Sequence, residues 1–364
     1  MPRRAAVIGS LILFLSVFGL AQGMDAPAGK TAGEVFKNIQ VLKDIPAGEL
    51  LPTMRYITVA LGVRCSFCHV EGNFSQDTEH KQTARRMMQM VFAANKSTFN
   101  GRPEISCYTC HRGSSHPQGV PPIAGATTAA AHPAASAPAG ARPSPDQIVT
   151  QYVAALGGAD AIAAIQSLVK IGTLVTPRGS MKVEIDRKLP DKELIVLQSE
   201  QGVRRQGFDG ATAWEQEGDG APRTESGAGA RAAGPPAPLE IALALQHGTQ
   251  GMRVLGSEEV NGRAAWRVAA RRPQGGFELL DFDAANGLLL RVETFQRTPL
   301  GALPEATDYS DYRDVQGVKL PFSVRVAGAE NARTFQFDSI RANVTLADER
   351  FRPAGAGAGS ASQK

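Results

Sequence analysis

The sequence is poor in cysteine, in net charge and in long apolar runs, and each shortage narrows what the protein can be. Only four of its 364 residues are cysteines, so at most two disulfides can form. The formal net charge of +4 falls far short of the concentrated basic stripe of a nucleic-acid binder, and we expect no nucleic-acid partner. After residue 20, no apolar run is long enough to cross a bilayer as a helix.

The composition is that of a folded protein with more than one domain. Apolar residues make up 43% of the chain, enough to give two domains of ordinary size a buried core each. The sequence therefore excludes a fully disordered protein.

The first residues have the pattern of a secretory signal. Two arginines, Arg3 and Arg4, precede an apolar run from Ala5 to Leu20, and Ala21-Gln22-Gly23 provides a small-residue cleavage site. We predict a signal peptide over residues 1–23 and a periplasmic mature protein that starts near Met24. The alternative is an uncleaved membrane anchor, although the run is short for a bilayer span.

Three helices are predicted before residue 117, and no strand. Apolar spacing and stop signals place them at Gly33–Ile45, Glu49–Leu61 and Glu79–Asn95. Gly62 follows the second helix directly and is suited to end it. The sequence thus predicts an all-α domain over residues 24–117.

A linker separates this domain from the rest of the chain. From Ser114 to Pro145 the residues are mainly Ala, Pro, Gly, Ser and Thr, with almost no large apolar side chain to seed a core. We place an Ala/Pro-rich linker at residues 118–145.

The second predicted domain is β-rich and spans residues 146–353. Two short helices, Asp146–Leu156 and Ala159–Ile165, precede apolar runs of strand length. Asn261-Gly262, Asn286-Gly287 and Gln316-Gly317 lie between neighbouring runs and suit tight hairpin turns. We expect an antiparallel sheet with a short helix at Leu239–Gln246, a mobile loop over Gly218–Pro238, and a disordered tail at 354–364.

Two motifs carry the chemistry. The four cysteines occur as CSFCH, from Cys65 to His69, and CYTCH, from Cys107 to His111. Each is Cys-x-x-Cys-His, the attachment signature of c-type haem. Two thiols along one turn can add to the two vinyl groups of one porphyrin, and the adjacent histidine can ligate the iron. We therefore predict two covalently bound haem c groups attached through Cys65, Cys68, Cys107 and Cys110.

Other uses of paired cysteines explain the pattern less well. Two disulfides or a four-cysteine zinc site require no histidine directly after each pair, yet both pairs have one. A thioredoxin-like redox pair requires a βαβ setting, which this helical segment lacks.

Methionines provide candidates for the distal ligand of each iron. Met54 lies eleven residues before Cys65 on the helix that leads into the first motif. Met87, Met88 and Met90 lie on the helix between the motifs, and one of them could ligate the second iron. Packing in a core is the alternative for each methionine.

The residues around the motifs resemble those of the photosynthetic reaction-centre cytochrome c subunit family. The resemblance rests on FKNIQVLKDIPAGELLPTMRYITVALGVRCSFCHVEGNF, ARRMMQMVFAAN and CYTCHRGSSHP, within roughly Val35–Pro117. It implies a helix against each haem and methionine as the distal ligand.

Carried over to this chain, the resemblance implies distal ligands for both haems. Met54 would ligate the haem on His69, and Met90, five residues before Asn95, would ligate the haem on His111. Met87 and Met88 stay alternatives, because the stretch from Met90 to Cys107 is shorter than in the family. The family's subunit carries four haems and usually a lipid-modified N-terminal cysteine. This chain has only two haem motifs, and all four of its cysteines lie in them. We therefore expect a two-haem relative of the family.

The second domain shows a fainter resemblance, to LolA-like lipoprotein-carrier half-barrels. It rests on YVAALGGADAIAAIQSL, GFDGATAWEQ and DYRDVQGVKLPFSV. It implies a curved sheet that could hold a lipid or lipoprotein, whereas a sheet with an ordinary core is the alternative.

Three functions follow from these patterns. The first is an electron carrier, not an enzyme, whose partners are redox proteins, membrane-bound electron-transfer complexes among them. The second is a di-haem peroxidase-type enzyme with one open iron. The third is a lipid- or lipoprotein-binding β-domain with a redox-sensing cytochrome module.

Overall fold

The computed structural model describes most of the chain, in two units. The described residues are 29–117, 142–226, 234–246, 248, 250–271, 277–328 and 331–353. The chain divides into a helical unit, Met1–Gly119 with Thr298–Gly301, and a sheet unit that comprises the rest. The predicted signal peptide, the linker over residues 118–141 and the predicted tail lie outside the described residues.

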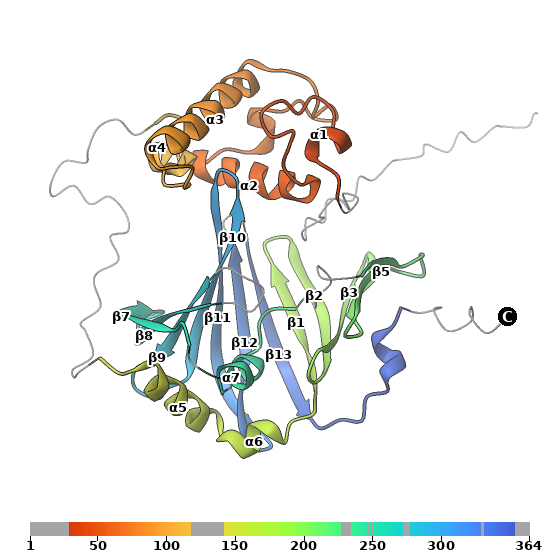
Figure 1. The fold of residues 1–364 in the computed structure, drawn as a ribbon. Coiled ribbons are helices and arrows are strands. Elements are labelled where there is room, and N and C mark those ends of the chain that lie inside the picture. Colours follow the sequence, from red (N-terminus) through yellow and green to blue (C-terminus); the bar gives the residue numbers. More distant parts are fainter. Residues whose placement is uncertain are drawn as a thin grey trace, which may run out of the picture. The chain divides into compact units, whose positions relative to one another are not determined.

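Short and long helices occur over the described residues 29–117 of the first unit. Its elements are α1 (Ala32–Val35), η1 (Ala47–Glu49), α2 (Leu50–Leu61), η2 (Cys65–Phe67), α3 (Glu79–Thr98) and α4 (Cys107–His111) (Figure 1). Within residues 29–117 the only strand-like pairs are the isolated bridges Thr31–Pro46 and Val70–Asn73.

Two of the three predicted helices in this unit are present. The helix predicted at Glu49–Leu61 is α2, and the helix predicted at Glu79–Asn95 is α3, which continues to Thr98. Gly62 ends α2 with φ of +65°, a conformation that glycine adopts without the strain of a side chain.

The prediction of a helix over Gly33–Ile45 is wrong. Only Ala32–Val35 is helical, and the chain then folds back on itself. The N–H groups of Ala32 and Gly33 donate to the carbonyls of Ile45 (2.8 Å) and Lys43 (2.9 Å). The apolar residues of this segment are therefore spaced along a loop, not along a helix face, and Leu42 is buried from that loop.

The core of the helical unit is small. Its buried apolar side chains include Leu42, Tyr56, Ala60, Met88 and Val91. A core of this size provides limited stability by itself, and units of this kind commonly depend on a bound group.

A single antiparallel sheet of thirteen strands forms the second unit. Its order is β6-β5-β4-β3-β2-β1-β13-β12-β11-β10-β9-β8-β7, so β1 pairs with β13 and two meanders extend from that pair. The strands are β1 (Ser167–Thr176), β2 (Gly179–Lys188), β3 (Lys192–Ser199), β4 (Gly202–Phe208), β5 (Thr212–Glu217), β6 (Arg223–Ser226), β7 (Arg253–Val260), β8 (Arg263–Arg271), β9 (Phe277–Asp283), β10 (Leu289–Thr298), β11 (Gly301–Val315), β12 (Val318–Gly328) and β13 (Ala332–Ala342).

Four short helices accompany the sheet. They are α5 (Pro145–Leu156), α6 (Ala159–Ala163), α7 (Pro238–Gln246) and η3 (Asp348–Phe351). Figure 1 shows α5, α6 and α7 gathered at one end of the sheet. The predicted β-rich domain with helices is thus confirmed in outline.

Two of the three predicted tight turns are present, and several strands were not expected. Asn261 and Gly262 have φ of +51° and +78°, and Gln316 and Gly317 have +54° and +83°, as two-residue hairpins with the twist of their strands require. At the third, Asn286-Gly287, residues 284–288 separate β9 from β10, and only Gly287 among them has a positive φ, +75°. The strands β4, β5, β6, β7 and β11 were not among the predicted apolar runs of strand length. Part of the predicted loop at Gly218–Pro238 is β6, and residues 227–233 of it are outside the described residues.

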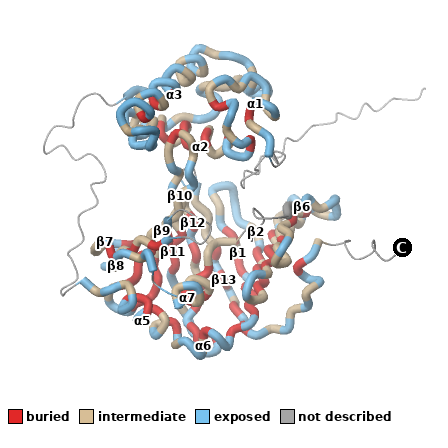
Figure 2. The backbone as a smooth tube through the Cα atoms, in the orientation of Figure 1, coloured by how far each residue is buried: buried red, intermediate tan, exposed pale blue. Residues whose placement is uncertain are grey.

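Aromatic side chains join the helices to the sheet. The fully buried Tyr152 of α5 donates a hydrogen bond to the Pro238 carbonyl at 2.6 Å and packs edge-on against Phe282, with ring centroids 5.1 Å apart. Near η3, the Trp214 indole N–H donates to the Phe351 carbonyl at 2.7 Å. Buried positions recur along the strands of this unit, as Figure 2 shows.

Buried charges lie among these apolar groups. Arg187 pairs with Glu193 and Glu240, each at 2.5 Å, and the three bring β2, β3 and α7 together. Lys170 is also buried, with its ammonium 5.5 Å from the centre of the Phe337 ring. Burial lowers the pKa of Lys170 to about 8, and the nearby Arg187 acts in the same direction.

We expect Lys170→Met to stabilise the full chain at pH 7 by about 1–3 kcal/mol, because methionine removes a buried charge. Since the pKa of Lys170 is lower in the folded than in the unfolded protein, this penalty is present below pH 8 and disappears as the pH rises toward 10.5. Urea unfolding at pH 7 and pH 10 measures it. The exposed Lys182→Met is the control, and an equal effect of both variants would contradict the account.

Candidate haem-attachment site

Each Cys-x-x-Cys-His motif forms one helical turn. In the first motif, which contains η2, the N–H groups of Cys68 and His69 donate hydrogen bonds to the Cys65 carbonyl, with N–O distances of 3.2 and 3.0 Å. This turn begins three residues after α2 ends at Gly62. Both cysteines are free thiols on the same short turn, as attachment to one porphyrin requires.

The second motif is the helix α4 itself. Ser106 precedes it, and the Ser106 N–H donates to the hydroxyl of Thr109 at 3.0 Å, so a capping box begins the turn. Arg112 ends the turn with φ of +51°. Cys107 and Cys110 are again free thiols one turn apart.

Both motif histidines have the same hydrogen bond. The Nδ1 atom of His69 lies 3.1 Å from the Phe74 carbonyl, and the Nδ1 atom of His111 lies 2.9 Å from the Ser114 carbonyl. A carbonyl can only accept, so Nδ1 carries the proton and donates it in each case. Nε2 of each ring then has the free lone pair that a metal ligand needs.

Hydrogen bonds fix the first motif to α3. Thr78, the residue before α3, donates from its hydroxyl to the Cys68 carbonyl at 2.7 Å and accepts from the Lys81 N–H at 3.2 Å. Asp77 stabilises the loop between the first motif and α3. Its carboxylate accepts a hydrogen bond from the Asn38 side-chain amide at 2.8 Å and forms an ion pair with Arg85 at 3.0 Å. These partners keep the pKa of Asp77 below its usual value, with the Asn38 hydrogen bond as the largest cause.

A buried asparagine fixes the approach to the second motif. The side chain of Asn95 donates to the Ile105 carbonyl at 2.7 Å and accepts the Ile105 N–H at 2.8 Å. Ile105 lies two residues before Cys107. α3 therefore anchors one motif near its first residue and the other near its last turn.

A close backbone contact joins the two motifs directly. The Gly113 N–H donates to the Ala60 carbonyl at 2.9 Å. A Cβ atom at Gly62 would lie 2.1 Å from the Gly113 carbonyl oxygen, so only glycine allows this approach. Gly62 precedes the first motif and Gly113 follows the second, so the two motifs are held together at this contact.

The candidate distal methionines differ in burial. Met54 on α2 is half-buried, and Met88 on α3 is buried at 7% exposure. Met87 and Met90 are exposed, at 42% and 53%. Met88 thus packs in the core, whereas the thioethers of Met87 and Met90 are on the surface, where a porphyrin face could reach them.

The residues at the motifs fit a porphyrin. Nine large apolar side chains are exposed in the described part of the chain, and five of them lie in or between the motifs: Phe67, Phe74, Met87, Met90 and Tyr108. Exposed apolar groups concentrated in one segment mark a surface that another apolar body covers. Two thiols that can bond to the porphyrin vinyl groups and one imidazole that can ligate the iron, all on one turn, are the groups that haem c attachment requires.

Burial acts on one cysteine of each motif. It raises the pKa of Cys107 to about 11 and also raises that of Cys68. In the residues that the structure describes, no three or more His, Cys, Asp or Glu side chains are grouped to hold a metal ion.

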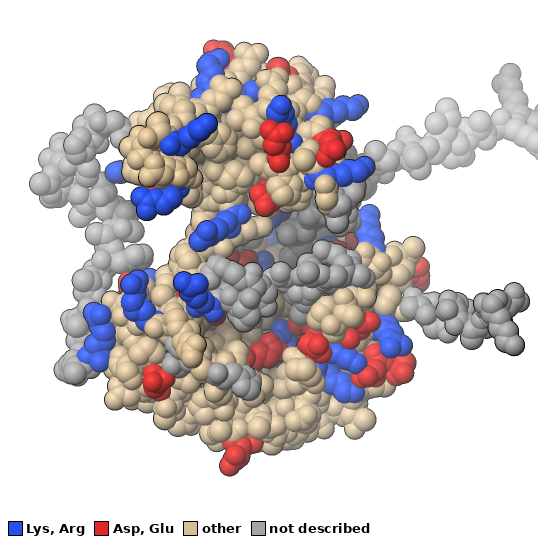
Figure 3. All heavy atoms as spheres, in the orientation of Figure 1, with Lys and Arg blue, Asp and Glu red and all other residues tan. Residues whose placement is uncertain are grey.

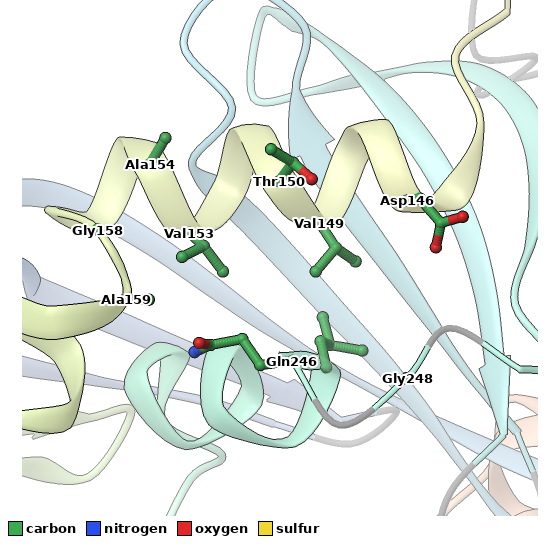
Figure 4. A pocket seen from close by; sticks show the side chains of 10 residues that line it. Asp146, Val149, Thr150, Val153, Ala154, Gly158, Ala159, Gln246 and Gly248 are labelled. Carbon is green, nitrogen blue, oxygen red and sulfur yellow. The ribbon is translucent and has the colours of Figure 1, made fainter.

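Another concave region lies in the sheet unit, between α5 and α7. A pocket of about 540 Å³ is lined there by side chains that include Val149, Val153 and Gln246, and Figure 4 shows these three between the two helices. Among the residues that the structure describes, the lining includes one carboxylate, Asp146.

Charges of both signs are spread over the surface. On the face shown in Figure 3, lysines and arginines alternate with acidic side chains on both units. This distribution agrees with the small net charge. No helix in the described ranges is long and apolar enough to span a bilayer.

The helical unit is similar to c-type cytochromes. Residues 17–151 match the family "Photosynthetic reaction centre cytochrome C subunit". The reaction center cytochrome c subunit of Thermochromatium tepidum is 40% identical over 95 residues, 25% of this chain and 24% of that protein. That of Rubrivivax gelatinosus is 34% identical over 98 residues, 26% of each chain. The resemblance predicted from the motifs is thereby confirmed, and the chain spans about a quarter of the length of these relatives.

Solved structures resemble the sheet unit more distantly. A DUF1329 family protein from Desulfovibrio piger is 14% identical, with a TM-score of 0.42, over 57% of this chain and 96% of that one. A LolA superfamily protein from Nitrosomonas europaea is also 14% identical, with a TM-score of 0.40, over 58% of this chain and 99% of that one. Likenesses of this degree support no statement about a ligand.

Several residues that shape the site were not predicted. Cysteines, histidines and methionines were predicted from the sequence, but Thr78 and Gly113 were not, and Asn95 served only to locate Met90. Thr78 directly precedes the helix predicted from Glu79, and threonine is a preferred N-cap residue, so its capping role could have been predicted from the sequence. Hydrogen bonds that join residues far apart in sequence, such as that of Asn38 with Asp77, leave no local signal.

We expect Gly62→Ala to destabilise the helical unit by about 2–4 kcal/mol, because it adds both left-handed strain and a clash with Gly113. Gly72→Ala is a matched control, since Gly72 also has a positive φ, +76°, but has nothing within 4 Å. Thermal unfolding of the full chain compares them. Equal losses in both variants would show that the Gly62–Gly113 contact contributes nothing.

Proposed function

We propose that the chain is a periplasmic di-haem c-type cytochrome that carries electrons between redox partners. One haem c is attached through Cys65 and Cys68 with His69 as proximal ligand. The second is attached through Cys107 and Cys110 with His111 as proximal ligand. The proposal includes a mature all-α di-haem domain from residue 24 to 117, released from a signal peptide over residues 1–23.

The observation that carries this proposal is the matching pair of imidazoles. Each motif histidine donates from Nδ1 to a backbone carbonyl, which leaves Nε2 as the only free nitrogen. Disulfide, zinc and dithiol-redox alternatives give no reason for this arrangement to occur twice, one residue after each cysteine pair.

Bound haem supplies a one-electron couple at its iron, and the chain's residues control the surroundings. The thiols would fix the porphyrin, the imidazoles are held in one orientation by their Nδ1 hydrogen bonds, and exposed apolar side chains such as Phe74 and Tyr108 would shield the bound group from water. Redox proteins, including membrane-bound electron-transfer complexes, are the partners proposed.

Methionines are proposed as the distal ligands. Met54 is assigned to the haem on His69 and Met90 to the haem on His111. The exposure of Met90 supports its assignment over Met88, whose thioether is used in the core. Met87 is a weaker candidate, because it lies nearly a full helical turn farther from Cys107 than Met90 does.

The test of the di-haem proposal is a count of haem per chain. The full-length protein, made in cells with a cytochrome c maturation system, is expected to contain two haems that stay attached after denaturation. A pyridine haemochrome assay with protein quantitation measures the ratio. A ratio of one or zero would overturn the proposal.

Methionine variants separate the carrier from an enzyme with one open iron. Met54→Ala and Met90→Ala should each lower one reduction potential and allow carbon monoxide to bind one iron, because a thioether ligand is lost. Met88→Ala should instead cost about 2–5 kcal/mol of folding stability and leave both irons closed. Rapid binding of carbon monoxide by the unaltered protein would favour the peroxidase-type alternative.

A further inference from the structure

Each motif histidine donates a hydrogen bond to a backbone carbonyl, and the two carbonyls differ in whether a second group also donates to them. The Phe74 carbonyl accepts the His69 Nδ1 proton at 3.1 Å and also the Lys81 ammonium at 2.9 Å. The Ser114 carbonyl accepts from His111 at 2.9 Å, and among the described residues no cation shares it. Among the described residues, the carbonyl partner of His69 thus also accepts a hydrogen bond from a cation, which places a positive charge two hydrogen bonds from the proposed iron ligand.

The ammonium of Lys81 is held in place. It donates to the Gln76 carbonyl at 3.2 Å as well as to Phe74, and its side chain is only 12% exposed. Lys81 lies in the first turn of α3, where the N-terminal end of the helix adds positive potential. Its position is therefore set by backbone groups on two sides.

The charge of Lys81 is only partly balanced by its one ion-pair partner among the described residues. The closest carboxylate oxygen is on Asp77, at 3.9 Å. Asp77 pairs more closely with Arg85, at 3.0 Å, and also accepts from Asn38. Two cations thus share one carboxylate, and this group keeps a net charge of +1 beside the first motif.

We propose that Lys81 is a positioning residue that makes the haem on His69 the higher-potential haem of the pair. The inference rests on the proposed di-haem function. A cation on the Phe74 carbonyl makes that oxygen a weaker acceptor for His69, so the imidazole gives less electron density to the iron. The same charge also disfavours the ferric state, which carries one more positive charge than the ferrous state.

This difference gives the pair an order. When one electron is present, it resides mainly on the haem of His69. Electron transfer from the haem on His111 to the haem on His69 is then downhill. The donor would deliver to the second motif, and the acceptor would take from the first.

The test is a redox titration of the full di-haem protein and its Lys81→Gln variant. Glutamine can still donate to the Phe74 carbonyl but has no charge. We expect the equilibrium constant between the two haems to fall about tenfold, equal to about 59 mV for a one-electron couple. The higher potential should fall and the lower one should stay.

Two further variants separate charge from structure. Lys81→Arg keeps the charge and should retain most of the gap between the two potentials. Lys96→Gln removes a charge from an exposed position on the same helix and should leave the gap unchanged. An unchanged gap in Lys81→Gln, or an equal change in Lys96→Gln, would overturn the inference.

The failure of this inference differs from the failure of the proposed function. Two haems per chain with a gap that does not respond to Lys81 would remove only the role of Lys81. A chain with fewer than two haems would remove the di-haem function itself. The haemochrome ratio measured on the same samples distinguishes the two results.

Discussion

The two hydrogen bonds from histidine Nδ1 to backbone carbonyls are the constraint on which the helical unit depends. A neutral imidazole has one donor and one acceptor nitrogen, and fixing the donor decides where the acceptor points. The accepting carbonyls belong to loops after each motif, at Phe74 and Ser114. Those loops must be held in turn, and most of the polar contacts around the motifs do this.

α3 links the supports of the two motifs. At the start of α3, the Thr78 hydroxyl donates a hydrogen bond to the first motif, and the Lys81 ammonium donates to the Phe74 carbonyl, which also accepts from His69. In its last turns, Asn95 fixes the approach to the second motif. A rigid helix between these points sets the distance between the motifs more reliably than a loop would. The Gly62–Gly113 contact closes the arrangement on the other side.

Helices and turns that depend on nearby residues could be predicted from the sequence. Features that depend on contacts between residues far apart in the sequence could not. α2 has regular apolar spacing and a glycine stop, and Asn261-Gly262 is a turn by its own conformational preference. Gly33–Ile45 has similar apolar spacing, yet Ala32 and Gly33 bond to Ile45 and Lys43, so tertiary contacts override the local preference. The proposed attachment residues are assigned from the spacing of cysteine and histidine alone, whereas the contacts of Asn95 and Lys81 involve partners that only the fold brings close.

The pairing of β1 with β13 has a consequence for how the protein is made. Leu168 lies opposite Ala342, so the two meanders cannot join until the chain has been synthesised as far as β13. Closing so long a loop carries a large entropy cost and slows folding, whereas the hydrogen bonds described around the cysteine motifs join residues between Asn38 and Ser114. The cysteine motifs can therefore reach their final shape while the sheet is still open, and a chain that ends before Ala332 would leave β1 and β12 as unpaired edges prone to association.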